Sequence, residues 1–172
     1  MKEKRENNAS LDNQKKTYSF IEKIPGIHFR ELQRRMNIGR GTLEYQVRKL
    51  LKRGLIHEEH NHFRRFYILG IPEQERLLLA LLRNDTYKKI LLALLQNHTL
   101  NHKQIMRLSL LSASSTSEHL KKLCEKGFIF AEKRGREKEY QITDEKEFMK
   151  TLIIYRKSFF DTLIDQFIEM WD

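Results

Sequence analysis

Residues 40–52 combine basic and hydrogen-bonding side chains with an apolar stripe at helical spacing. Leu43, Val47 and Leu50 fall on one side of the expected helix, and this spacing predicts that the side is buried. On the opposite side, guanidinium, amide and hydroxyl groups suit base edges in the major groove, while ammonium groups suit phosphates. We therefore predict a DNA-contacting surface made of Arg40, Thr42, Tyr45, Gln46, Arg48 and Lys49.

A shorter helix is expected immediately before this one. Phe29, Leu32 and Met36 recur three and four residues apart and define its apolar face. Residues 37–41 interrupt the pattern and include two glycines, which adopt unusual backbone angles at low cost. The two helices and their turn have the order of a helix-turn-helix, the arrangement that lays its second helix in the major groove.

A β-hairpin is predicted after the second helix. Gly54 is a candidate C-cap, and residues 55–56 begin a strand. Residues 58–62 are polar and predict a turn, and residues 63–69 return as a strand rich in β-forming side chains. The candidate DNA contacts in this hairpin are Arg64 and Arg65.

The order helix, helix, hairpin is that of a winged helix domain. The stretch HFRELQRRMNIGRGTLEYQVRKLLKRGLI, followed by HNHFRRFYILG, resembles the winged helix-turn-helix transcription regulators abundant in archaea, in the MarR/ArsR neighbourhood. The resemblance implies a DNA-binding regulator. It also implies that such a protein either recruits basal transcription factors or blocks a promoter, and the sequence does not choose between the two.

The chain repeats its pattern at an offset of 73 residues, with Val47 matching Leu120 and Tyr67 matching Tyr140. A repeat of this kind predicts two domains of one fold in tandem. The second copy has small hydroxyls and lysines on its outer helix and a basic hairpin tip, both suited to phosphate contact. Its candidate DNA contacts are Ser114, Ser115, Ser117, Lys121, Lys122, Lys133, Arg134 and Arg136.

We therefore expect a mainly α fold with small β-wings: two tandem winged helix-turn-helix domains and a long C-terminal helix. A helix is expected to begin at Asp12, after a polar, disordered N-terminal tail. A linker helix that is apolar on nearly every side is expected to lie buried. The boundaries are a tail at 1–10, winged helix domains at 11–70 and 84–143, a linker helix at 71–83 and a C-terminal helix at 144–172.

The C-terminal helix carries a wider apolar stripe than packing on one small domain requires. Monomeric proteins rarely expose large apolar patches, so we expect this helix to join two chains in a homodimer. The residues assigned to dimerisation are Leu152, Tyr155, Phe159, Phe160, Leu163 and Phe167.

The composition agrees with an anionic partner. The 172 residues carry a formal net charge of +10 and a pI near 9.7, which favours nucleic acid. The excess is uneven: residues 1–70 contribute +8, residues 71–143 contribute +5 and residues 144–172 contribute −3. A single cysteine, no signal-peptide pattern and apolar runs too short to span a bilayer predict a cytoplasmic protein without membrane contact.

The sequence supports other functions less well than DNA binding. A metal sensor is suggested by the cluster of His57, His60 and His62 with Glu58 and Glu59. A flexible hairpin turn holds metal ligands poorly in place, however, and we assign no metal or cofactor. Cys124 is expected to be a buried, inert thiol. No phosphate-binding glycine loop or nucleophile elbow supports an enzyme.

One rival function belongs to a different class. Winged helices also serve as interaction platforms, so the chain could instead be a scaffold that recruits basal transcription or chromosome-organising machinery and binds DNA with little sequence preference. RNA binding is less favoured, because no exposed aromatic platform for stacking bases is evident.

Overall fold

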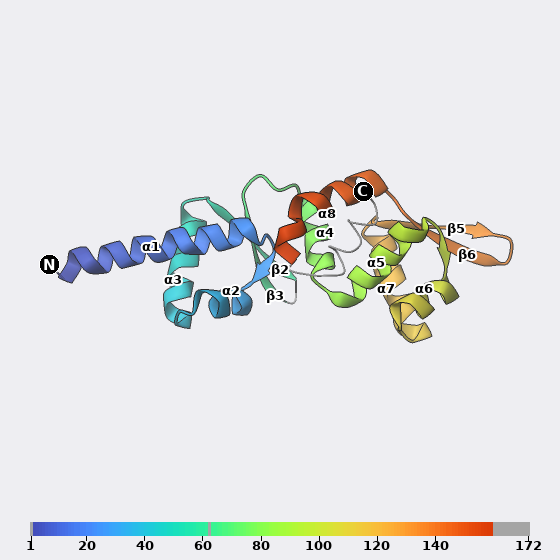
Figure 1. Ribbon diagram of the computed structural model, residues 1–172, viewed down its shortest axis with the longest axis horizontal. Helices are drawn as coiled ribbons and strands as arrows, with labels where there is room; N and C mark the ends of the chain where they lie inside the picture. Colours follow the sequence, from blue (N-terminus) through green and yellow to red (C-terminus); the bar gives the residue numbers. More distant parts are fainter. Residues whose placement is uncertain (1, 62, 160–172) are drawn as a thin grey trace. The chain divides into compact units, whose positions relative to one another are not determined.

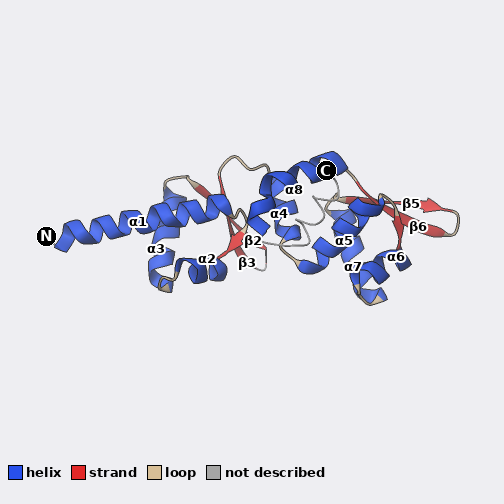
Figure 2. Ribbon diagram, in the orientation of Figure 1, coloured by secondary structure: helices blue, strands red, loops and turns tan. Residues whose placement is uncertain are grey.

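The computed structural model describes residues 2–61 and 63–159, with only the backbone described for residues 2–9 and 61. The described chain divides into two compact units. Unit 1 comprises residues 2–76 together with the end of the last helix from Lys157, and unit 2 comprises Leu77–Arg156. Helices predominate, and the strands are short (Figures 1 and 2).

Unit 1 is a three-helix winged helix domain with a small sheet. Its strands are antiparallel in the order β1-β3-β2, and β2 with β3 forms the wing. The predicted polar turn at 58–62 is wrong in extent, because the strand continues to Asn61. The elements are α1 (Lys2–Lys23), β1 (Ile27–His28), α2 (Phe29–Met36), α3 (Arg40–Lys52), β2 (Ile56–Asn61) and β3 (Phe63–Ile68).

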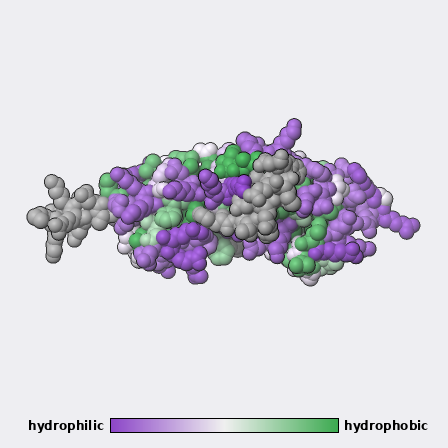
Figure 3. Space-filling model, in the orientation of Figure 1, coloured by the Kyte–Doolittle hydropathy of each residue, from purple (hydrophilic) through white to green (hydrophobic). Residues whose placement is uncertain are grey.

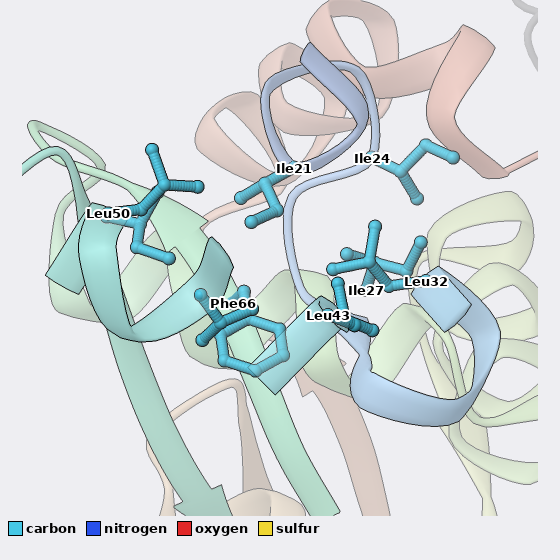
Figure 4. Packing of buried hydrophobic residues seen from close by; sticks show 9 residues of the cluster. Ile21, Ile24, Ile27, Leu32, Leu43, Leu50 and Phe66 are labelled. Carbon is cyan, nitrogen blue, oxygen red and sulfur yellow. The ribbon is translucent and has the colours of Figure 1, made fainter. Parts of the chain in front are cut away.

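The core of unit 1 lies where the three helices meet the sheet (Figure 4). Leu32 comes from α2, Leu43 and Leu50 from α3, and Phe66 from β3; each is almost completely buried. Burying one such side chain contributes roughly 1.5–3 kcal/mol. The predicted apolar stripe of α3 is therefore the face that anchors the helix, and its other face is turned outward.

The N-terminal helix is longer than the sequence pattern predicted. It begins at Lys2, not at Asp12, so the expected disordered tail is helical in the structure. The physical reason is composition: residues 2–10 contain Lys, Glu, Arg and Ala, which favour helix, and no glycine or proline to stop it. The extra length matters because α1 packs against α3.

The turn between α2 and α3 does not depend on its glycines. Asn37 is the left-handed residue, with φ 51°, whereas Gly39 is extended with φ −62° and Gly41 is helical. Asparagine tolerates the left-handed region better than most residues because its short polar side chain hydrogen-bonds locally. The assignment of the unusual backbone angles to glycine was wrong.

Unit 2 repeats unit 1 closely. The second copies of β1, α2, α3 and β2 all lie 73 residues further along the chain, as predicted. The sheet order is β4-β6-β5, which repeats β1-β3-β2, and the N-cap of α5 is Asn84, whose side chain accepts from the backbone N–H groups of Thr86 and Tyr87. The elements are α5 (Asp85–Asn97), β4 (Leu100–Asn101), α6 (His102–Ser109), α7 (Ala113–Glu125), β5 (Ile129–Arg134) and β6 (Glu137–Ile142).

The offset changes to 74 at the tip of the wing. One residue separates β2 from β3, whereas two separate β5 from β6. As a result, Tyr140 pairs with Leu100 in unit 2 as Phe66 pairs with Ile27 in unit 1. The predicted match of Tyr67 with Tyr140 was therefore wrong by one residue, and in a strand a shift of one residue exchanges the two faces.

Two further helices complete the described chain. The linker helix α4 (Glu73–Leu82) buries Leu78, Leu79, Leu81 and Leu82, as its sequence predicted. Helix α8 (Glu145–Phe159) begins after Asp144, whose carboxylate accepts the backbone N–H of Glu147. Residues 160–172 of the expected C-terminal helix lie outside the described residues. The fold is thus mainly helical with two tandem winged helix domains and a C-terminal helix, as predicted.

Candidate nucleic-acid interface

Helix α3 presents one exposed face made of polar and basic side chains. Thr42, Tyr45, Arg48 and Lys52 are exposed along the helix, and Arg40 is exposed at its first turn. The helix carries four cations and one carboxylate, a net charge of +3. Because its apolar face is held in the core, this face is fixed outward, in the arrangement that suits the major groove.

Tyr45 and Lys49 form a pair on this face. The Lys49 ammonium lies 4.4 Å from the centre of the Tyr45 ring. A hydrogen bond from Lys49 lowers the pKa of the Tyr45 phenol. The pair therefore places a positive charge and a hydroxyl oxygen side by side, a combination able to meet a phosphate or the acceptor edge of a base.

Gln46 is not on the exposed face. Its side chain is 1% exposed, and its Nε2 donates to Ser10 Oγ at 3.4 Å. Its Oε1 has no hydrogen-bond partner among the described residues. The prediction that Gln46 reads bases was wrong, because it assumed that α1 begins at Asp12, whereas α1 includes Ser10 and packs against α3.

Arg64 lies across the gap between α3 and the wing and does not extend into solvent. Its guanidinium bonds Glu58 of β2 at 2.5 Å and Glu44 of α3 at 2.6 Å. It also lies 5.1 Å from the ring centre of Phe29 and 5.6 Å from that of Phe66. The hydrogen bond to Glu58 raises the pKa of Arg64. We call this arrangement the Arg64 clamp; it engages Arg64 within unit 1, at a place where the sequence predicted a DNA contact.

Arg65 on the next position of β3 also has a structural role. Its Nη1 donates to the carbonyl oxygen of Gly26 at 2.7 Å, and burial lowers its pKa. Gly26 occupies the turn before β1 with φ 79°. Arg65 thus holds the turn after α1 and is not presented as a surface cation, which corrects its assignment to DNA.

The histidine cluster considered as a metal sensor is divided between the two faces of β2. His57 approaches Glu59 at 3.6 Å, and His60 approaches Glu58 at 3.0 Å. Both carboxylates already bind arginines, since Glu59 meets Arg76 at 2.5 Å and Glu58 meets Arg64. Among the described residues, no three such side chains are grouped to hold a metal ion. His62 lies outside the described residues.

The corresponding helix of unit 2, α7, is exposed in the same way but carries a different charge pattern. Ser114 and Ser117 are exposed and Ser115 is half-buried. Lys122 bonds Glu118 at 2.6 Å and Lys121 lies 3.9 Å from Glu125. With two lysines and two glutamates, α7 has no net charge. Its cations are therefore less available to phosphates than those of α3.

Ser117 is oriented by its neighbours. Its hydroxyl donates to the Ala113 carbonyl at 3.0 Å, so the 2.9 Å contact with His102 Nε2 is a hydrogen bond donated by the histidine. His102 begins α6, so this bond ties the two helices of the second helix-turn-helix together. Sequence reasoning missed it because the helices are brought together only by tertiary packing.

The wing of unit 2 keeps its predicted basic tip. Lys133, Arg134 and Arg136 are exposed around Gly135, which has φ 64°. Arg134 lies 3.3 Å from Glu139. The two other cations have no ionic partner in the part of the chain that the structure describes.

The α6–α7 turn carries exposed apolar side chains that sequence reasoning missed. Leu108 is 53% exposed and Leu110 is 85% exposed, and hydrophobic atoms are visible there in Figure 3. Leu110 has φ 58° and occupies the position of Asn37 in unit 1. The 73-residue offset could have identified Leu110 as exposed, because it places this residue at the exposed left-handed position of the turn.

The residues assigned to dimerisation have different environments. Leu152 is fully buried in the protein, so its side chain is not offered to a second chain. Tyr155 and Phe159 are half-buried, whereas Ile153 and Ile154 are exposed. Phe160, Leu163 and Phe167 lie outside the described residues. Phe148, four residues before Leu152 on the same helix, is also buried, so this side of α8 faces inward.

Comparison with protein families agrees with the two units. Residues 12–79 match a family model described as an N-terminal HTH domain (HTH_HVO_0163_N). Residues 83–129 match a family model described as winged helix-turn-helix DNA-binding. The chain therefore carries two helix-turn-helix domains in tandem, of which the second matches a winged model, and this confirms the resemblance found in the sequence.

A curated relative is similar to most of the chain. It is the uncharacterized HTH-type transcriptional regulator MJ1398 of Methanocaldococcus jannaschii, 29% identical over 133 residues. The match covers 77% of this chain and 34% of that protein, so the chain spans about a third of its relative.

Solved structures show partial similarity. The transcriptional repressor PagR of Bacillus anthracis is 27% identical with a TM-score of 0.42, over 48% of this chain and 93% of that one. The homodimeric winged helix-turn-helix DNA-binding domain Mb0332 of Mycobacterium bovis is 20% identical with a TM-score of 0.38, over 51% and 86% of the two chains.

None of the helices that the structure describes is long and apolar enough to cross a bilayer.

Proposed function

We propose that the chain is a non-enzymatic transcription regulator that binds double-stranded DNA sequence-specifically, with α3 of unit 1 as its main reading helix. The observation that carries this proposal is the exposed face of α3. Arg40, Thr42, Tyr45 and Arg48 face outward on a helix of net charge +3 whose other face is locked in the core. A rigid helix with base-reading and phosphate-binding groups on one face is the general device of helix-turn-helix readers.

The side chains of α3 suit different parts of a duplex. Arg40 and Arg48 can each bind guanine through two hydrogen bonds, the commonest specific contact in the major groove. Thr42 and Tyr45 offer hydroxyls, and Lys49 adds charge beside Tyr45. Lys52, at the far end of the same face, suits the phosphate backbone. Gln46, Arg64 and Arg65 have no part in this proposal.

Unit 2 contributes a second, weaker contact. Hydrogen bonds to phosphates suit the hydroxyls of Ser114, Ser115 and Ser117. Positive charge comes from Lys121 and Lys122 once DNA phosphates replace the glutamates with which they pair. The wing tip adds Lys133, Arg134 and Arg136, which suit the flanking backbone. Such contacts position a protein on the duplex without carrying much sequence information.

We further propose a homodimer formed through α8. Exposed Ile153 and Ile154, neighbours on one turn of α8, support it, since paired isoleucines on a helix surface suit burial against another chain. A two-fold dimer predicts a palindromic site with half-sites spaced by helical turns. A regulator acting on the chromosome in this way would work in the cytoplasm.

Selection of bound sites from a random duplex pool at two salt concentrations tests the proposal. We expect a palindromic motif that survives the higher salt. On that motif, Arg40→Ala with Arg48→Ala should cost about 2–6 kcal/mol of binding free energy, at roughly 1–3 kcal/mol for each base-reading contact. The matched control is Lys89→Ala, an exposed cation on α5. Equal losses in both variants would contradict the assignment to α3.

A second candidate function is a scaffold that recruits basal transcription or chromosome-organising machinery. The observation that favours it is the exposed pair Leu108 and Leu110 at the turn of the second helix-turn-helix, where unit 1 has Arg35 and Asn37. Apolar side chains at this place suit a protein better than a phosphate backbone. In the same selection, a scaffold would yield no motif, and its DNA binding would disappear at the higher salt.

A further inference from the structure

Unit 2 contains an open groove of about 590 Å³ between α7 and its wing. Leu120 and Tyr140 provide apolar surface, and Cys124 lies among them. Ser117, Lys121 and Lys138 add polar and charged groups to the lining. The volume falls within the range of about 300–1,000 Å³ that is typical of small-ligand sites.

The equivalent place in unit 1 is filled by the protein itself. There the Arg64 clamp spans from α3 to β2, and the guanidinium lies between Glu44 and Glu58 and over the Phe66 ring. The Arg64 side chain thus occupies this space with its flat guanidinium group, and the two carboxylates neutralise its charge.

Each part of the clamp is replaced in unit 2. Glu44 corresponds to Ser117 and Glu58 to Ala131 at the offset of 73, and Arg64 corresponds to Lys138 at the offset of 74. The strand pairings agree, since His60 pairs with Arg64 and Lys133 pairs with Lys138.

These replacements open the groove and change its charge. Lys138 is exposed and has no ionic partner among the described residues, and both carboxylates of the clamp are missing from its surroundings. Lys121 lies at 3.9 Å from Glu125, which only partly balances it. Where unit 1 holds its own cation, unit 2 therefore presents an uncompensated cation to solvent.

Apart from Glu125, whose carboxylate lies 3.9 Å from the Lys121 ammonium, the polar groups of the groove do not oppose an anion. Burial raises the pKa of the Cys124 thiol and of the Tyr140 phenol, so both remain neutral at pH 7. A neutral hydroxyl or thiol can donate a hydrogen bond to an anionic oxygen. The lining thus combines an apolar surface for a small body with a cation for its charged head.

We propose that this groove binds a small organic anion, with an aliphatic or aromatic body against Leu120 and Tyr140 and a carboxylate or sulfonate head on Lys138. The bound molecule joins α7 to the wing as Arg64 joins α3 to its wing. The site goes beyond the proposed DNA binding and does not depend on it.

The only cysteine of the chain reports on the groove. Hexanoate serves as the probe, and the rate of Cys124 alkylation by iodoacetamide is measured at constant ionic strength. Hexanoate should slow alkylation in a saturable manner, and calorimetry should give one site per chain. Sodium sulfate tests the head alone and hexanol the body alone. If sulfate protects Cys124 as well as hexanoate does, the site is only a surface cation. If hexanol protects it equally well, the site is only an apolar hollow. Either result overturns the proposal, and so does the absence of any protection by hexanoate.

Three variants locate the binding. Lys138→Ala should weaken hexanoate binding about tenfold, the effect of one charge-assisted hydrogen bond. Lys133→Ala removes an exposed cation of the same wing outside the groove and should leave binding unchanged. The triple variant Ser117→Glu, Ala131→Glu, Lys138→Arg rebuilds the clamp of unit 1 and should abolish both binding and protection. Circular dichroism checks folding, and if the triple variant does not fold, Lys138→Ala decides. Unchanged affinity in Lys138→Ala overturns the site.

Discussion

The two units share a backbone plan but differ in what their outer helices carry. Helix α3 has a net charge of +3 and ties its one carboxylate to the wing, whereas α7 pairs each lysine with a glutamate on its own surface. The cores correspond position by position while the outer faces do not. Core positions are constrained by packing, whereas outer positions are free to take different partners. A duplicated fold can therefore hold two functions.

The largest expected effect tests whether the cores are equivalent. Leu50 and Leu123 occupy the same place in α3 and α7, and both are almost completely buried. Leu50→Ala and Leu123→Ala should each lower the free energy of unfolding of their own unit by about 2–5 kcal/mol, because each leaves a cavity. Denaturant unfolding monitored by hydrogen exchange resolves the two units. An effect under about 1 kcal/mol at either position would show that the two cores are packed differently.

A smaller effect separates the two wings. Arg64→Ala should lower the stability of unit 1 by about 1–3 kcal/mol, because two partly buried carboxylates lose a charged hydrogen-bond partner. Lys138→Ala, at the equivalent place in unit 2, should change stability by less than about 0.5 kcal/mol, as for an exposed side chain without a partner.

Thermal unfolding of the two variants measures this difference. Arg64→Lys is the control for charge, since lysine keeps the charge but lacks the fork that meets both Glu44 and Glu58. Equal effects of Arg64→Ala and Lys138→Ala would remove the contrast between a closed and an open wing.

The smallest expected effect concerns the turns. Leu110 is a leucine in the left-handed region, where unit 1 has Asn37. Leu110→Asn should raise the stability of unit 2 by about 0.5–1 kcal/mol, because asparagine is less strained at that backbone angle. The reciprocal change Asn37→Leu should lower the stability of unit 1 by a similar amount. Chemical denaturation compares the pair, and effects of the same sign would disprove the equivalence of the turns.

Much of the fold was predictable from local pattern. The apolar stripe of α3, the buried leucines of α4 and the 73-residue offset all follow from spacings along the chain. The outer face of α3 was also predicted, apart from one residue. Helical periodicity states which side of a helix is buried against its own domain, and for most positions no other element intervenes.

The errors share a cause. Gln46 lies on the polar side of α3 by periodicity, yet it is buried and donates a hydrogen bond to Ser10 of α1. By sequence, Arg64 and Arg65 look like free cations of the wing. In the structure, Arg64 bonds Glu44, and Arg65 donates to the carbonyl oxygen of Gly26. Tyr140 was aligned one residue out because an extra residue in a wing tip leaves no trace in hydrophobic spacing. For Gln46, Arg64 and Arg65, the partner lies far away in the sequence.

The sequence by itself determined the class of fold, the tandem repeat and the positively charged helix of unit 1, because these depend on periodicity and composition. Only the tertiary structure decided which polar side chains remain outside and which are bound within the protein. Glu44 meets Arg64 across 20 residues and Gln46 meets Ser10 across 36. Contacts of this range arise when packing brings distant segments together, so the filled wing of unit 1 and the open groove of unit 2 are properties of the folded chain alone.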